Sequence, residues 1–273
     1  MSDWLELSRA DAPLIVCFPH TGLELPTSLA PHYVSAWLAR KDADHHVHRL
    51  YAFARQLGAT TLRTTISRSV IDVNRDPSGA SLYPGQATTE LCPTTTFDGE
   101  PLYRPGAEPS AAEIGQRTKT WFWPYHHALQ AEIDRLRAQH ERVVVYDAHA
   151  IRSRIERLFP ATLPELNLGT NDDKSCDPTL SQALQQVIAS SDRSWVANGR
   201  FKGGWTTRHY GAPTRGVHAV QIELACRSYM QEPDVPDESS WPALFEPARA
   251  APLQVVLEQI LRACLAFATR RDT

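Results

Sequence analysis

The sequence predicts a three-layer α/β/α fold, in which a mainly parallel, mixed sheet lies between two layers of helices. Short apolar runs rich in β-branched residues alternate with amphipathic helical patterns along the chain. This alternation is typical of a sheet whose parallel strands are covered on both faces. The 273 residues, of which 42% are hydrophobic, can bury one large core, and no repeat or low-complexity linker divides them. We therefore expect a single domain over residues 1–273.

Apolar runs predict six strands, at 14–18, 59–63, 70–73, 143–146, 195–197 and 217–223. Helices are expected over 47–57, where apolar residues recur at helical spacing and Gly58 can end the helix, and over 110–139 and 252–269. The stretches 76–109 and 152–178 lack periodicity and are rich in turn formers. We predict two long loops there, and loops of that length in a compact domain usually belong to a functional site.

Composition limits the classes of partner and the compartment. A net charge of -3, without a run of like charges, gives no reason to expect binding to nucleic acid or to a membrane, so the expected partner is a small molecule. The N-terminal residues lack the basic and apolar regions of an export signal, which predicts a cytoplasmic protein. Five scattered cysteines without a C-x-x-C pair predict reduced thiols. The sequence leaves the oligomeric state open.

Several familiar catalytic motifs are missing from the sequence, among them G-x-S-x-G, G-x-x-x-x-G-K-[ST], G-x-G-x-x-G and H-E-x-x-H. Their absence disfavours serine hydrolases, P-loop nucleotidases, dinucleotide enzymes and helical zinc proteases. Polar residues instead follow several predicted strands, at the sheet edge where open α/β proteins place their sites.

Two histidines at strand ends predict a metal site. His20 follows the run at 14–18, and His149 follows the run at 143–146. Either alone could be a hydrogen-bonded turn histidine, but the pair suits a catalytic zinc ion, which takes neutral imidazoles and a carboxylate. Asp44, just before the helix at 47–57, either caps that helix or turns its carboxylate toward the same metal.

Glu223 ends an otherwise apolar strand. A buried carboxylate without a partner is costly, so this residue needs a partner or a chemical role. Beside a metal and a water molecule, that role is general base and then general acid.

Several long motifs resemble those of the N-formylglutamate amidohydrolases, over roughly residues 14–231. They are SRSVIDVNR at 67–75, NGRFKGG at 198–204 and TRHYG at 207–211, with shorter matches at 19–22, 124–126, 147–149, 166–171 and 216–223. The resemblance implies a phosphorylase/hydrolase-like fold, similar to zinc carboxypeptidases, with one zinc ion. It also implies hydrolysis of N-formyl-L-glutamate to formate and L-glutamate in histidine degradation.

The carboxypeptidase pattern matches at His20, His149 and Glu223 and departs at two positions. Position 23 is Leu where that pattern has Glu, so we expect Asp44, rather than Glu24, to supply the carboxylate ligand. Position 150 is Ala where the family usually has Ser, which predicts the loss of a hydrogen bond near the metal.

The implied substrate carries two carboxylates and therefore needs two fixed cations, for which guanidinium is well shaped. We expect Arg75, with Asn74 beside it, and Arg208 to hold them, with Lys202 in reserve, and Arg68 to stabilise the oxyanion. For any of these cations a surface salt bridge is the alternative.

Two other functions remain open at this point. A related zinc hydrolase would act on another N-acyl amino acid, as aspartoacylases do, or on a peptide C-terminus, as carboxypeptidases do. A protein that kept only the cationic pocket would bind an amino acid without turnover.

Overall fold

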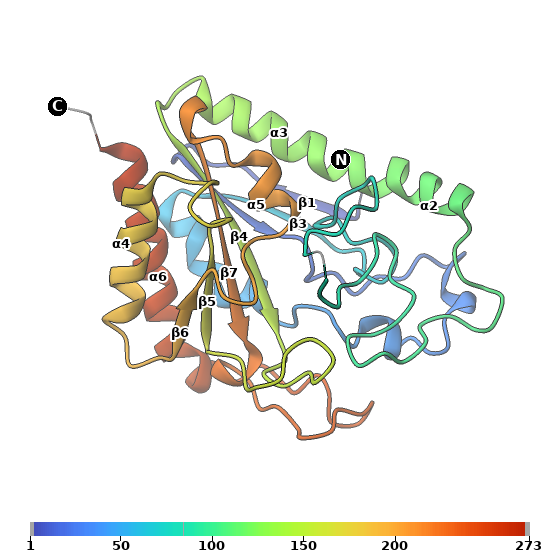
Figure 1. The fold of residues 1–273 in the computed structure, drawn as a ribbon. Helices are drawn as coiled ribbons and strands as arrows, with labels where there is room; N and C mark the ends of the chain where they lie inside the picture. Colours follow the sequence, from blue (N-terminus) through green and yellow to red (C-terminus); the bar gives the residue numbers. More distant parts are fainter. Residues whose placement is uncertain (1–2, 84, 271–273) are drawn as a thin grey trace.

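A seven-stranded sheet runs through the computed structural model, which describes residues 3–83 and 85–270. Its spatial order is β1-β3-β2-β4-β7-β5-β6 (Figure 1). The strands are β1 Leu5–Ser8, β2 Leu14–Phe18, β3 Thr60–Thr64, β4 Val143–Ile151, β5 Leu166–Gly169, β6 Trp195–Ala197 and β7 Val217–Ala225. Strands β3, β2, β4 and β7 are parallel neighbours, whereas β1 and β5 pair antiparallel with β3 and β7. The predicted mainly parallel, mixed sheet is confirmed, and the carboxyl ends of β2, β4 and β7 meet at one edge.

Helices cover both faces of this sheet, which confirms the three layers. The α-helices are α1 Val47–Leu50, α2 Ala111–Arg117, α3 Trp123–Arg137, α4 Pro178–Ala189, α5 Trp205–Tyr210 and α6 Pro247–Thr269. Helices α1, α4 and α6 pack on one face, and α3 and α5 pack on the other (Figure 1). A π-helical segment, Thr118–Phe122, joins α2 to α3, so the predicted helix at 110–139 is present with one irregular turn.

Helix α6 is long and apolar enough to cross a membrane by length and composition alone. In the structure it lies on the sheet beside α4, and Leu253, Leu257 and Ile260 on its inner face are fully buried. Core packing therefore accounts for its apolar composition. It begins at Pro247, five residues before the predicted start, with Pro252 inside it.

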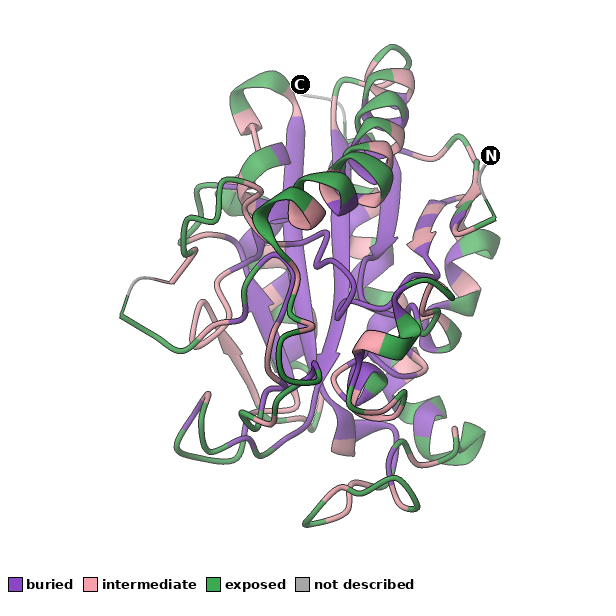
Figure 2. Cartoon of the chain, turned by 90° about the vertical axis from the view of Figure 1, so that its right-hand side faces the viewer, coloured by how far each residue is buried: buried purple, intermediate pink, exposed green. Residues whose placement is uncertain are grey.

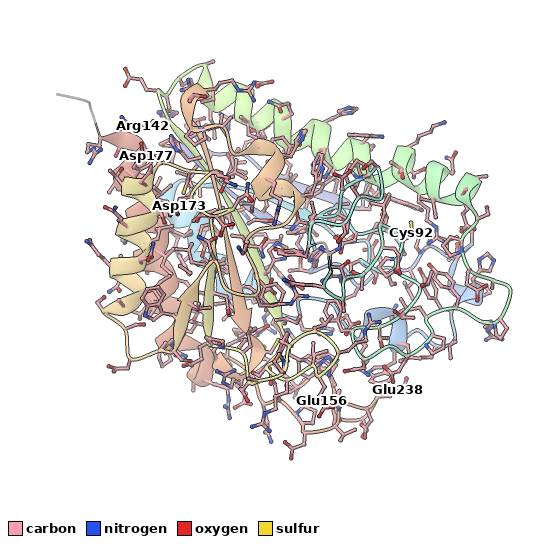
Figure 3. The ribbon with its side chains drawn as sticks, in the orientation of Figure 1. Cys92, Arg142, Glu156, Asp173, Asp177 and Glu238 are labelled. Atoms are coloured by element: carbon pink, nitrogen blue, oxygen red, sulfur yellow. The ribbon has the colours of Figure 1, made fainter. Side chains whose placement is uncertain are left out.

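The predictions for 70–73 and 152–178 differ from the structure. The apolar run at 70–73 is not a strand, because the Val70 N–H donates to Ser67 O in a turn. The apolar side chains of this run, those of Val70, Ile71 and Val73, pack in the core beneath α3. The predicted loop at 152–178 contains β5, and α4 begins at its end. Asp177 (Figure 3) caps α4 by accepting the Thr179 N–H at 2.8 Å. An Asp-Pro pair is a usual helix start, so this signal was present in the sequence.

Other local predictions agree with the structure. Gly58 has a φ of 74° and ends the helical segment that begins with α1, although residues 52–57 form a 3₁₀ helix. The described residues of 76–109 contain isolated β-bridges but neither a helix nor a regular strand, as expected of a long loop.

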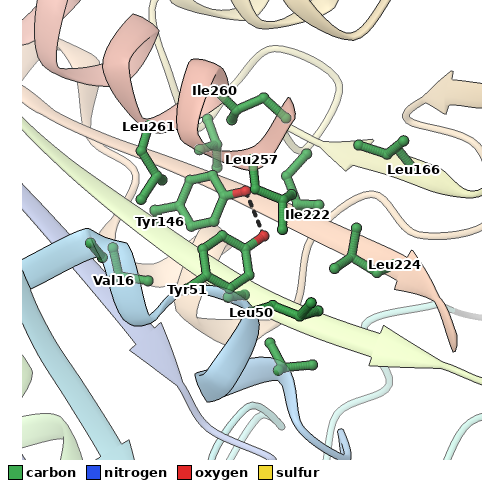
Figure 4. Packing of buried hydrophobic residues seen from close by; sticks show 14 of the residues in the cluster. Val16, Leu50, Tyr51, Tyr146, Leu166, Ile222, Leu224, Leu257, Ile260 and Leu261 are labelled. Carbon is green, nitrogen blue, oxygen red and sulfur yellow. Dashed lines mark hydrogen bonds between the residues drawn. The ribbon is translucent and has the colours of Figure 1, made fainter. Parts of the chain in front are cut away.

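The alternation of side chains along β4 and β7 sorts the polar residues onto one face. All nine residues of each strand are buried (Figure 2). Tyr146 points into the core beneath α6, where its hydroxyl lies 2.9 Å from the Tyr51 hydroxyl (Figure 4). Because successive side chains of a strand point to opposite faces, Asp147 and His149 face the α3 and α5 side. Glu223 on β7 faces the same side, whereas its neighbours Ile222 and Leu224 point into the core beneath α6.

Candidate metal centre and active-site pocket

The chain turns sharply after β2 and holds His20 at the carboxyl edge of the sheet. Gly22 makes this turn possible, because a Cβ atom at this position would lie 2.2 Å from the Ile66 carbonyl oxygen. The Glu24 N–H then donates to Thr65 O at 2.8 Å, which ties the turn to the segment after β3. The imidazole of His20 is buried as a result.

His20, His149 and Asp44 converge at this edge of the sheet. His149 Nδ1 lies 3.1 Å from His20 Nδ1 and 3.1 Å from Asp44 Oδ2, and His20 Nδ1 lies 3.7 Å from Asp44 Oδ2. The Asp44 N–H donates to His20 O at 2.9 Å, which fixes Asp44 beside His20. The capping alternative for Asp44 is wrong, because His46 is the N-cap residue of α1 and makes no side-chain cap bond. Glu24 is exposed at the surface.

The donor atoms of these three residues suit a small divalent cation. Ligands bound tetrahedrally at zinc distances are about 3.3 Å apart, close to the separations found here. Asp44 Oδ1 is buried without a hydrogen-bond partner among the described residues, and such a group calls for a ligand. Two imidazoles and a carboxylate are also the donors that zinc takes in catalytic sites.

A second layer of carboxylates orients the two imidazoles. His20 Nε2 lies 2.6 Å from Asp72 Oδ1, and His149 Nε2 lies 2.9 Å from Asp147 Oδ2. With both Nε2 atoms donating, each Nδ1 turns a lone pair toward the centre, which is the usual support of a metal-bound histidine. Asn74 Nδ2 donates to Asp147 Oδ2 at 2.8 Å, so Asn74 holds Asp147 in place.

The charges around the triad keep the carboxylates of Asp44 and Asp72 ionised. Burial alone would raise the pKa of Asp72, but His20, Arg68 and Arg75 hold that pKa well below its usual range. Burial likewise opposes the ionised form of Asp44, and contacts with His149 and His20, when these imidazoles are protonated at both nitrogens in the metal-free site, lower its pKa below the ordinary value. Negative charge therefore gathers where a cation would bind.

Glu223 lies beside the triad, directly opposite His149 in the β4–β7 register. Gln221 orients it: the Gly204 N–H donates to Gln221 Oε1 at 2.7 Å, so Gln221 Nε2 faces Glu223 Oε2 at 3.2 Å. Burial raises the pKa of Glu223 to about 8. A cation at the triad would favour the ionised form, which is the form a general base needs.

A pocket opens onto this site and holds about 570 Å³ of empty space, including its mouth. His20, His149 and Glu223 line it, as do three arginines, Arg68, Arg75 and Arg200. The remaining lining residues are Asn74, Tyr83, Ala87, Thr88, Thr89, Phe97, Ile151, Leu158, Phe201, Gly204 and Gln221. The pocket therefore combines acid–base groups with positive charge, as a small anionic substrate requires.

The structure does not bring every predicted cation to this pocket. Arg68 lies there with its Nη2 atom 2.6 Å from Asp72 Oδ2, and Arg75 Nε donates to Thr89 O at 3.1 Å. Arg208 is not among the lining residues, and its guanidinium lies 5.1 Å from the centre of the Tyr83 ring. Lys202 also lies outside the lining and pairs with Asp172 at 3.0 Å.

Three site residues were not singled out from the sequence. Asp72 and Arg200 lie within motifs noted there, but each comes from an irregular segment. Gln221 precedes Glu223 by two residues and so shares its face of β7, a spacing that could have revealed it.

Ala150 faces away from the site. It is buried in the core beneath α6, on the face of β4 opposite His149. A hydroxyl there would point into that apolar core, so the expected loss of a hydrogen bond near the metal is wrong.

Comparison with known proteins assigns the chain to a family. A family model described as N-formylglutamate amidohydrolase matches residues 12–230. The chain belongs to this family. It is 43% identical to an N-formylglutamate deformylase of Pseudomonas putida and 42% identical to one of Pseudomonas aeruginosa, in each case over 99% of both chains. The protein is therefore an enzyme, an amidohydrolase, and the non-catalytic alternative falls away.

Solved structures support the fold. The crystal structure of an N-formylglutamate amidohydrolase from Ralstonia eutropha JMP134 superposes with a TM-score of 0.79 at 21% identity, over 97% of this chain and 98% of that one. A gene product of Agrobacterium tumefaciens superposes with a TM-score of 0.73 at 18% identity, over 97% and 96% of the two chains.

Proposed function

We propose that this enzyme hydrolyses N-formyl-L-glutamate to formate and L-glutamate, with one divalent ion, zinc, held by His20, Asp44 and His149. The observation that carries the proposal is the buried triad, whose donor atoms all lie within 4.8 Å of one another and whose two histidines line a pocket that three arginines also line. Identity of 43% with a deformylase over the whole chain supports the substrate. A place in histidine degradation is part of the proposal and rests on the resemblance of the sequence motifs.

The residues around the pocket divide the chemistry between them. A bound zinc ion would act as a Lewis acid toward the formyl oxygen and the attacking water. Glu223 takes the proton of that water and returns one to the amide nitrogen as the C–N bond breaks. Arg68, whose Nη1 atom lies 3.7 Å from Asp44 Oδ1, is close enough to the triad to stabilise the oxyanion. Gln221 keeps the Glu223 carboxylate oriented throughout.

The test measures formate release from a panel of N-acyl amino acids by the zinc-loaded protein. N-formyl-L-glutamate should give the highest kcat/KM, ahead of N-formyl-L-aspartate, N-acetyl-L-glutamate and N-acetyl-L-aspartate, whose acyl products are assayed separately. A higher kcat/KM for an acetylated amino acid would replace the proposal with the alternative, a related zinc hydrolase of other N-acyl amino acids.

A further inference from the structure

We infer that Arg200 binds one of the two carboxylates of the substrate, as an anion subsite in the wall of the pocket. This inference rests on the proposed function for the identity of the substrate. It concerns a residue outside the triad and its supporting carboxylates, on the segment between β6 and α5.

The guanidinium of Arg200 is held in a fixed orientation by two loops. Its Nε atom donates to Leu158 O at 3.0 Å, and its Nη2 atom donates to Ala87 O at 2.8 Å. The rings of Tyr83 and Phe201 each lie 5.3 Å from the guanidinium carbon. Because both carbonyls are neutral, these contacts orient the cation without neutralising it.

The charge of Arg200 stands out among the arginines of the pocket. Arg68 and Arg75 lie 2.6 and 3.7 Å from Asp72 Oδ2 and share its negative charge. Within residues 3–83 and 85–270, no carboxylate oxygen comes within 4.0 Å of a nitrogen of Arg200. A half-buried cation without a counter-ion attracts an anion, and the pocket is open to one.

The hydrogen-bonding capacity left on Arg200 matches a carboxylate. Its Nη1 atom makes no hydrogen bond within the part of the chain that the structure describes. A guanidinium whose plane is already fixed loses little entropy when it pairs with a carboxylate, which makes the pair both tight and directional. Lys202, two residues further on, already has Asp172 as its partner.

The inference is tested with Arg200→Gln and three substrates: N-formyl-L-glutamate, its γ-amide N-formyl-L-glutamine and its α-amide N-formyl-L-isoglutamine. The variant should lose on the order of 100-fold in kcat/KM on N-formyl-L-glutamate, mainly through KM, because a desolvated charge pair is broken. For one of the two amides, which lacks the carboxylate that Arg200 binds, parent and variant should differ by only a few fold. For the other amide, kcat/KM should fall in the variant by the same factor as it does for N-formyl-L-glutamate.

Two further variants separate charge recognition from a structural role. Arg157→Gln removes an exposed guanidinium that also donates to a backbone carbonyl, Phe97 O, but does not line the pocket. This control should leave kcat/KM for all three substrates unchanged. Arg200→Lys keeps the charge without the planar fork and should give an intermediate loss on the same substrates. It also serves as the test if Arg200→Gln does not fold. Equal losses on all three substrates, or no loss on any, would overturn the inference.

A binding measurement keeps this inference distinct from the proposed function. If the parent enzyme releases no formate from N-formyl-L-glutamate, the proposed function fails. Calorimetric titration of the zinc-loaded proteins with L-glutamate then decides on Arg200 alone. Binding to the parent that is at least tenfold weaker in Arg200→Gln supports the subsite, whereas equal binding, or none to the parent, rejects it.

Discussion

Replacing Asp147 by Asn should weaken metal binding without removing a metal ligand. Asp147 is fully buried, and its Oδ2 atom accepts hydrogen bonds from His149 Nε2 at 2.9 Å and from Asn74 Nδ2 at 2.8 Å. An Asn side chain keeps the shape and one acceptor oxygen but removes the negative charge that makes His149 a better donor to a cation. Loss of such a supporting group typically costs about 10- to 100-fold in metal affinity, or about 1.4–2.7 kcal/mol.

The assay is a competition titration of zinc between the metal-free protein and a chromogenic chelator. A parallel measurement of Tm with and without zinc should show a smaller zinc-induced shift in the variant, because a weaker ligand stabilises the folded state less. Glu132→Gln is the matched control, since Glu132 is also buried and ion-paired, to Arg9 and Arg135, yet lies away from the triad. The control should lose stability but not zinc affinity. Parental zinc affinity in Asp147→Asn would refute the supporting role of Asp147.

Three further variants test separate parts of the site. Glu223→Gln should keep zinc and lose about a hundredfold to ten-thousandfold in kcat, because the amide cannot accept the water proton. An undiminished kcat would remove Glu223 from the mechanism. Arg68→Gln should lower kcat far more than it raises KM, as expected of a group that stabilises the transition state; a change confined to KM would argue against that role. Gly204→Ala should cost about 1–3 kcal/mol in unfolding free energy and also weaken zinc binding, because its Cβ would lie 2.4 Å from the Asn74 amide nitrogen. Gly115→Ala, in an open position of α2, should instead be neutral or stabilise by up to about 1 kcal/mol, and equal unfolding free energies in the two variants would contradict the packing argument.

The strand-borne part of the site could be predicted from the sequence. His20 and His149 follow or end strong apolar runs, and the carboxyl ends of parallel strands meet at one edge. Glu223 was found in the same way. For these residues a local pattern and one rule of sheet topology are enough, because the sheet itself determines where the side chains point.

The loop-borne part could not be predicted in this way. Asp72 lies in the run at 70–73, whose apolar residues predicted a strand, although they pack beneath α3 as a turn. Arg200 and Arg208 are both cations of motif segments, and only the path of the chain decides that Arg200 lines the pocket. Strand β5 carries Asn and Gly in four residues, too short a run to be recognised without its neighbour β7.

Zinc content of the triad variants is the most direct test of the proposed centre. Purified parent protein and Glu223→Gln should each hold one zinc ion per chain after dialysis, while His149→Ala and Asp44→Ala, checked for folding by circular dichroism, should hold almost none. Formate release by the parent should stop when zinc is removed and return when it is restored. Full zinc content in the folded His149→Ala and Asp44→Ala proteins, or undiminished formate release by metal-free parent protein, would contradict a zinc centre at His20, Asp44 and His149.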